Sequence, residues 1–166
     1  MHRRYRRRHF GNRDKYSVEQ TIINAPNSGQ WELYPAGGSL AASRQVSYSI
    51  LPPTDVQGMR KIKHFDLTFT STSDSLPFYY ALVFVPNGYP VQRINLPVEG
   101  LATSAYDANQ FVISQGVLDF SGGPLRIKSP LSRNLNSGDS ISLVLATYDQ
   151  VEANVLASIK YAITLQ

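Results

Sequence analysis

The chain has no cysteine, and charged residues make up only 17% of its 166 residues. Disulfides and thiolate metal sites are therefore excluded, and cysteine usage gives no indication of the redox compartment. Apolar runs are short: even residues 78–85 end at Pro86-Asn87-Gly88, well below the roughly 20 residues that a membrane-spanning helix needs. The arginine-rich start is not followed by an apolar segment of the signal-peptide type. We therefore expect neither membrane insertion nor secretion through such a signal.

Histidine is also scarce, and this limits the catalytic possibilities. Of three histidines only His64 lies outside the first ten residues, two positions before Asp66 in a predicted strand, and no serine stands in a nucleophile-elbow pattern. Four aspartates stand beside turn residues, where a carboxylate commonly bends the chain: Asp107, Asp119, Asp139 and Asp149. No cluster of His, Asp and Glu has metal-ligand spacing, and no phosphate-loop or dinucleotide motif is present. We expect no enzyme activity, no cofactor and no metal site.

The basic residues are concentrated in residues 1–15, which we call the arm. The arm holds seven of the 16 Lys and Arg and one of the 12 Asp and Glu, a net charge of +6, whereas residues 16–166 hold nine cations and eleven anions, a net charge of −2. The sequence thus suggests a polyanionic partner that is reached by the arm rather than by a broad basic face. Repulsion between cations at helical spacings predicts that residues 1–14 are disordered unless an anion is bound. The cations of the arm are Arg3, Arg4, Arg6, Arg7, Arg8, Arg13 and Lys15.

Arginine binds phosphate through paired hydrogen bonds and stays charged, so the arm predicts a sequence-independent grip on a nucleic-acid backbone. Tyr5 lies between the arginines, where its ring could stack on an unpaired base. If all seven cations engaged a single strand, log affinity would fall with log salt with a slope of about −5. A nuclear-localisation signal and a solubilising tail remain alternatives.

A second basic group consists of Arg60, Lys61 and Lys63. The two lysines share the parity of Phe65 in an alternating strand, so we expect this group at the solvent end of the strand. There it would extend the nucleic-acid-binding surface or serve solubility.

The remainder of the chain predicts many short strands separated by Gly- and Pro-rich turns. We expect about eight strands, from nine candidate ranges: 16–23, 44–51, 60–71, 78–85, 110–114, 117–120, 125–128, 140–148 and 157–165. Residues 78–85 are apolar on both faces, which indicates a strand covered on both sides. Helix signals are weak and limited to turns near 38–43 and 104–109. The pattern predicts an all-β antiparallel sandwich of the jelly-roll type over residues 15–166.

Several stretches together resemble the capsid proteins of small circular Rep-encoding single-stranded DNA viruses, the group that includes nanoviruses and circoviruses. They are MHRRYRRRHF at the start, MRKIKHFDLTFT at 59–70, FYYALVFVPNG at 78–88, PLRIKSPLSRNLNSGDSISLVLATY at 124–148 and SIKYAITL at 158–165. The resemblance implies a jelly-roll subunit that forms a small icosahedral shell, with arms that neutralise a packaged single-stranded DNA genome. It also implies a virion location, and an arm that host nuclear import receptors would recognise during assembly in the nucleus.

Three alternatives remain at this stage. An arginine arm on a jelly roll is also found in satellite viruses of plants, whose genome is single-stranded RNA. A non-viral β domain could bind nucleic acid, and a lectin-like sandwich could use Trp31 beside Glu32 for a sugar. For a shell, we expect subunit contacts from aromatic and proline residues in predicted loops: Tyr34, Pro35, Tyr89, Pro90 and Tyr106.

Overall fold

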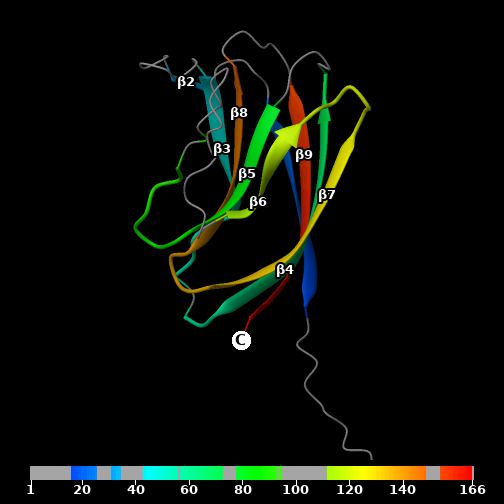
Figure 1. The fold of residues 1–166 in the computed structure, drawn as a ribbon. Helices are drawn as coiled ribbons and strands as arrows, with labels where there is room; N and C mark the ends of the chain where they lie inside the picture. The colour runs from blue at the N-terminus through cyan, green and yellow to red at the C-terminus, as the bar shows by residue number, and fades with distance from the viewer. Residues whose placement is uncertain are drawn as a thin grey trace, which may run out of the picture.

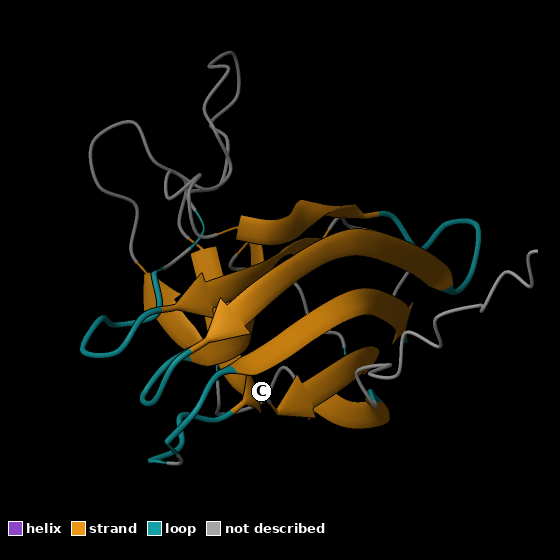
Figure 2. Cartoon of the chain, turned by 90° about the horizontal axis from the view of Figure 1, so that it is seen from below, coloured by secondary structure: helices purple, strands orange, loops and turns teal. Residues whose placement is uncertain are grey.

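The computed structural model describes residues 16–25, 31–34, 43–55, 57–72, 78–92, 94, 112–148 and 154–165. Within these ranges the regular structure consists of strands, as Figure 2 shows. Eight strands have seven or more residues, and one has three. In chain order the strands are β1 (Ser17–Ala25), β2 (Glu32–Tyr34), β3 (Ser43–Leu51), β4 (Arg60–Ser71), β5 (Phe78–Val85), β6 (Val112–Leu118), β7 (Leu125–Leu135), β8 (Ser140–Tyr148) and β9 (Val155–Leu165).

The strands form two antiparallel sheets packed face to face (Figure 1). One sheet has the order β1-β9-β4-β7 and the other β2-β3-β8-β5-β6. Leaving aside the three-residue β2, the chain crosses from one sheet to the other at every connection except that between β5 and β6, and its first and last long strands are neighbours in one sheet. This interleaved order is that of a jelly roll, which confirms the predicted fold class.

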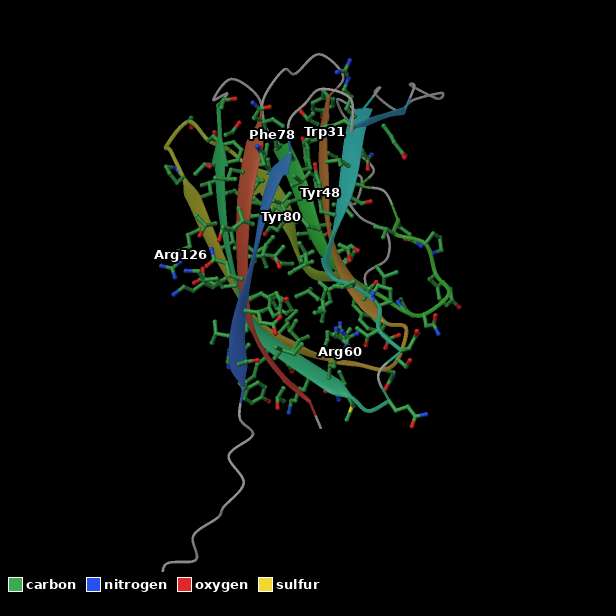
Figure 3. The ribbon with its side chains drawn as sticks, turned by 180° about the vertical axis from the view of Figure 1, so that it is seen from behind. Trp31, Tyr48, Arg60, Phe78, Tyr80 and Arg126 are labelled. Atoms are coloured by element: carbon green, nitrogen blue, oxygen red, sulfur yellow. The ribbon has the colours of Figure 1, made fainter. Side chains whose placement is uncertain are left out.

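The core lies between the sheets and is rich in aromatic residues. Phe78 lies with its ring centroid 6.3 Å from that of Trp31 and 5.9 Å from that of Phe120. Phe69 and Tyr80 bring the two sheets together with their ring centroids 5.2 Å apart. Figure 3 shows Trp31, Tyr80 and Phe78 among the strands of the sandwich. Buried rings of this size supply much of the apolar area that stabilises a sandwich.

Strand β5 is covered on both sides, as its sequence predicts. Its second face, with Ala81 and Val83, belongs to a smaller apolar cluster under Ile94, which is 1% exposed. Gln45 holds Ile94 in place over this cluster: its amide nitrogen donates to the Ile94 carbonyl at 2.5 Å, and its amide oxygen accepts from the Ile94 N–H at 2.8 Å. The two bonds satisfy buried backbone groups that would otherwise cost free energy.

Strand β4 contains a bulge at His64, whose φ is 57°. The pairing of β4 with β7 shifts between Lys63 and Phe65, and its pairing with β9 shifts between Lys63 and Asp66. A bulge inserts an extra residue and so changes which side chains face inward. Before His64 the buried residues are at even positions, 60 and 62, and after it at odd positions, 65, 67 and 69.

Some strand boundaries differ from the predicted ones. The two segments expected at 110–114 and 117–120 are one strand, β6, which continues through Gly116. A Cβ at residue 116 would lie 3.1 Å from the ring of Tyr80, so this glycine makes room for a tyrosine rather than ending the strand. Strand β7 continues past Lys128 to Leu135 although it contains Pro130, because β7 is an edge strand. The expected helical turn at 38–43 overlaps β3 at residue 43, and the rest of it and the turn at 104–109 lie outside the described residues.

Candidate nucleic-acid interface

The arm lies outside the described residues, so Arg3, Arg4, Tyr5, Arg6, Arg7, Arg8, Arg13 and Lys15 stay predictions. Its attachment point is described. Tyr16 is the first described residue, and the Nζ atom of Lys63 lies 3.6 Å from the centroid of its ring. An amine over an aromatic face at this distance is a cation–π contact. The chain that follows the arm therefore enters the fold beside Lys63.

Arg60 does not join the exposed basic surface that the sequence predicts for it. It is 7% exposed, and its Nη1 and Nη2 atoms donate to the carbonyls of Pro52 (3.3 Å) and Asp139 (3.0 Å). The parity argument fails because the bulge at His64 turns Arg60 and Ile62, rather than the lysines, to the side of Phe65. Arg60 ties the loop after β3 to the turn before β8, and Figure 3 shows it inside one end of the sandwich.

Lys61 and Lys63 lie on the outer side of the four-stranded sheet, whereas Phe65, whose parity they share, faces the core. In antiparallel pairs, directly opposite residues point to the same side of the sheet. Lys61 is opposite Thr164 and Asn134, and Lys63 is opposite Ala162 and Ser132. Both lysines are half-buried, and the amine of Lys63 lies over the ring of Tyr16.

Three further cations lie on the same side. Lys160 of β9 and Lys128 of β7 are directly opposite Asp66 of β4, one from each side, and Arg126 is opposite Thr68. We call the outward side chains of β9, β4 and β7 the cationic face. Its charged members are Lys61, Lys63, Arg126, Lys128 and Lys160 against Asp66 alone, five cations and one anion, a net charge of +4.

Asp66 is the centre of this face. Its carboxylate accepts two hydrogen bonds from Arg126, one of them from Nε at 2.8 Å, in a bidentate pair. Figure 3 shows Arg126 projecting away from the sandwich. The hydrogen bond from Arg126 is the largest effect and lowers the pKa of Asp66; burial opposes it, and the charges of Arg126, Lys128 and Lys160 lower the pKa further. Asp66 is therefore a carboxylate at neutral pH and offsets only part of the positive charge around it.

The outer side of the other sheet is different. On β3, β8, β5 and β6 its outward residues include Gln45, Ser142, Val144 and Gln115, with no charged side chain among the described positions. Glu32, on the short β2, is opposite Gln45. The charge of the described part of the domain is thus unequal between the two faces. The net charge of −2 for residues 16–166 does not reveal this difference between the faces.

The residues expected at subunit contacts are only partly described. Tyr89 is 67% exposed and lies with the exposed Pro90 in the loop after β5. Tyr34 ends β2, its side chain is not described, and Pro35 and Tyr106 lie outside the described residues. Sequence reasoning missed a second group of exposed apolar side chains, Val18, Ile22 and Leu156, on the outward side of β1 and β9. The signal in the sequence for this group is the alternation of β1, which places Val18 and Ile22 on one side of the strand.

The residues considered for an enzymatic or sugar-binding site, His64, Asp66 and Trp31, are occupied by other contacts or positions in the fold. His64 occupies the bulge, and the carboxylate of its neighbour Asp66 is engaged by Arg126. Trp31 is 9% exposed and packs on Phe78, so it is not an open platform for a sugar. Among the described residues, no three His, Asp or Glu side chains are grouped so that they could hold a metal, and no helix is long and apolar enough to span a membrane.

The expected turn role holds for the two aspartates that are described. Asp119 accepts a hydrogen bond from the N–H of Ser121 at 3.0 Å, and Asp139 accepts from the N–H groups of Asn87 (3.0 Å) and Asn136 (2.8 Å). The bonds to Ser121 lower the pKa of Asp119. Asp107 and Asp149 lie outside the described residues.

No protein-family model and no curated protein sequence matches this chain. Among solved structures, it is similar to a chain of the full particle of Israeli acute paralysis virus heated to 63 degrees, with a TM-score of 0.39 and 9% identity over 92% of this chain and 70% of that one. It is also similar to the CBM36-1 domain of a multidomain xylanase from the hindgut metagenome of Trinervitermes trinervoides, with a TM-score of 0.33 and 13% identity over 87% and 96% of the two chains.

A third similar structure is dimeric latent PorU of Porphyromonas gingivalis, with a TM-score of 0.35 and 13% identity over 91% of this chain. The chain spans only 13% of the PorU chain. These neighbours include a virus particle and a carbohydrate-binding jelly-roll domain, and likenesses of this degree do not distinguish between their functions.

Proposed function

We propose that this chain is a viral coat protein that self-assembles into a small icosahedral shell and packages a single-stranded DNA genome through its arm. The observation that carries the proposal is the run of five arginines in six positions, 3–8, joined to a single jelly-roll domain. One arm of net charge +6 binds nucleic acid weakly and in a salt-dependent way. Many arms held around one polymer bind it together, because each bound arm raises the local concentration of the next.

The surface of the described domain supports assembly. Five of the seven large apolar side chains that are exposed among the described residues lie in two places, on β1 and β9 (Val18, Ile22 and Leu156) and in the loop after β5 (Tyr89 and Val91); Val117 and Leu131 lie elsewhere. Exposed apolar patches on a domain commonly mark protein contacts. Two different patches on one subunit suit head-to-tail contacts, which close into rings and shells when the rotation between copies allows it.

The partners of the proposal are other copies of the chain and single-stranded nucleic acid. The virion is its proposed location, and recognition of the arm by host nuclear import receptors is part of the same proposal. A satellite-type RNA genome remains the alternative, since arginine contacts to phosphate do not read the sugar.

The test is assembly with its cargo. The purified chain would be examined by size-exclusion chromatography and electron microscopy, and co-purified nucleic acid by nuclease protection and by its sensitivity to DNase and RNase. We expect shells that protect DNA, and shells without cargo, or none, from a full-length variant in which Arg3, Arg4, Arg6, Arg7 and Arg8 are glutamine, which we call the neutral-arm variant. A chain that stays monomeric across salt and pH and protects no nucleic acid would refute the proposal.

A further inference from the structure

We propose that the cationic face is a second nucleic-acid contact, which holds the phosphate backbone of the same strand that the arm binds. The inference rests on the proposed function for the nature of the ligand. It assigns to binding three residues from two strands, Arg126 and Lys128 on β7 and Lys160 on β9.

The first argument is charge segregation. Of the described residues from Tyr16 on, the face carries five of the eight Lys and Arg and one of the six Asp and Glu. The other described residues hold three cations and five anions, so an approaching polyanion is attracted to this side more than to the rest of the described surface. Clustering of one sign on a surface raises the local concentration of a ligand of the opposite sign.

The second argument is that the face has more positive charge than its own carboxylate can balance. Lys128 and Lys160 are both directly opposite Asp66, and Asp66 is already bound bidentately by Arg126. Like charges side by side on one sheet face are destabilising. A phosphate backbone laid across β9, β4 and β7 would relieve this repulsion and meet amines at separations of about 10 Å across two strand spacings.

The third argument is continuity with the arm. Tyr16, the residue after the last cation of the arm, has its ring 3.6 Å from Nζ of Lys63 at the border of the face. A strand gripped by residues 3–15 is therefore led onto Lys63 and Lys61, and from there toward Lys160 and Lys128.

The chemistry of the face defines the kind of contact. Its outward residues on β9, β4 and β7 are lysines, one arginine, Asp66 and small polar or aliphatic side chains such as Thr68 and Ser158, without a described aromatic ring for base stacking. The contact is accordingly made to phosphate, with no sequence preference and a strong dependence on salt.

The test compares full-length chains that have lost the same amount of charge in two places. K128Q/K160Q removes two cations from the face. The control, S47E/Q115E, adds two anions at exposed outward positions of the other sheet, so its net charge falls equally. Affinity for a fluorescent oligothymidylate would be measured by anisotropy across a salt series, after circular dichroism and thermal melting show that both variants are folded.

We expect K128Q/K160Q to flatten the salt slope by about 1.4 and to weaken binding about 25-fold at 0.1 M salt, since each lost phosphate contact removes about 0.7 from the slope for a single strand. S47E/Q115E should leave the slope unchanged. Equal losses in the two variants, or an unchanged slope in K128Q/K160Q, would overturn the inference.

Two further arms of the experiment separate this inference from the proposed function. If the neutral-arm variant loses oligonucleotide binding while K128Q/K160Q retains all of it, the arm alone binds the genome and the inference fails although the proposed function stands. Heparin is the second probe. If the cationic face mattered for heparin and not for the oligonucleotide, its partner would be a sulfated polysaccharide, and the inference would again be overturned.

Discussion

The two sheets of this jelly roll present opposite outer faces. The four-stranded sheet carries five cations and one carboxylate on β9, β4 and β7, most of them in contact with solvent. The five-stranded sheet has Ala81, Val83 and Val144 on its outer side, sealed by Ile94 and the amide of Gln45. One face is thus an open charged surface, and the other is the floor of a second small core. The difference shows that the two sheets of one sandwich can carry unlike outer faces, one charged and open and the other covered by Ile94.

The largest expected contrast comes from placing the same lysine on each face. Val144 is 2% exposed, so Val144→Lys buries an ammonium group and should lower the free energy of unfolding by about 3 kcal/mol or more. Thr68 lies on the cationic face opposite Ser158 and Arg126, and Thr68→Lys should cost less than about 1 kcal/mol through repulsion. Urea unfolding of the two variants measures both values. Similar losses would mean that the two faces are equally covered.

The next contrast is between neighbouring cations on opposite sides of one strand. Arg60→Met removes the donor to the carbonyls of Pro52 and Asp139 and should cost about 2 to 4 kcal/mol of stability. Lys61→Met lies on the outer side and should change stability by no more than about 0.5 kcal/mol. The salt slope of oligonucleotide binding should fall by about 0.7 for Lys61→Met alone. Denaturation and anisotropy on the same preparations distinguish the two effects, and a reversed order would contradict the inward placement of Arg60.

A smaller effect is expected from the single carboxylate of the cationic face. Asp66→Asn removes the one carboxylate and raises the net charge of the face from +4 to +5. It should strengthen oligonucleotide binding by up to about fivefold at 0.1 M salt. The hydrogen bond from Arg126 and the neighbouring cations lower the pKa of Asp66 in the folded state. Its contribution to stability is therefore present above its unfolded pKa, near 4, and is lost as pH falls through the folded value.

The affinity of the unmodified chain should accordingly rise toward that of Asp66→Asn as pH falls through the folded pKa of Asp66. Anisotropy at a series of acidic pH values gives this comparison. If the affinities of the unmodified chain and of Asp66→Asn differed by the same factor at every pH, the charge of Asp66 would not oppose oligonucleotide binding.

The smallest effect concerns the covered face. Burial, followed by the hydrogen bond with Tyr148, raises the pKa of Tyr79 to about 12. Since an unfolded tyrosine ionises near 10, the folded state holds more protons between about pH 10 and 12, and stability falls with rising pH across that window. Tyr79→Phe should make this alkaline loss shallower, at a cost below about 1 kcal/mol at neutral pH. Urea unfolding at pH 9 to 12, roughly the window of the two pKa values, tests it, with Tyr89→Phe as the exposed control.

Much of the fold could be predicted from local patterns. Alternation placed β4 and β9 within a residue or two of their observed bounds, and the doubly apolar sequence of β5 correctly indicated a strand covered on both sides. These features depend on residues two apart in the chain, where the period of a strand is visible.

The features that the sequence did not predict correctly depend on partners far away in the chain. The bulge at His64 has no Gly or Pro to mark it, and it reversed the parity on which the placement of Arg60 relied. The cationic face is assembled from β9, β4 and β7, so it exists only through a pairing register that joins Lys160 and Lys128 to Asp66. Gly116 was wrongly predicted to separate two strands, because the ring of Tyr80 that occupies the space beside it comes from another strand.

Pro130 has a consequence for how copies of this chain can meet. It sits in the edge strand β7, beside the register shift opposite His64, and it has no N–H to offer a further strand. Prolines and bulges on an edge prevent sheets of neighbouring molecules from joining into one endless ladder. Subunits of the proposed shell would meet at very high local concentration, and Pro130, together with the register shift beside it, hinders the growth of fibres from this edge.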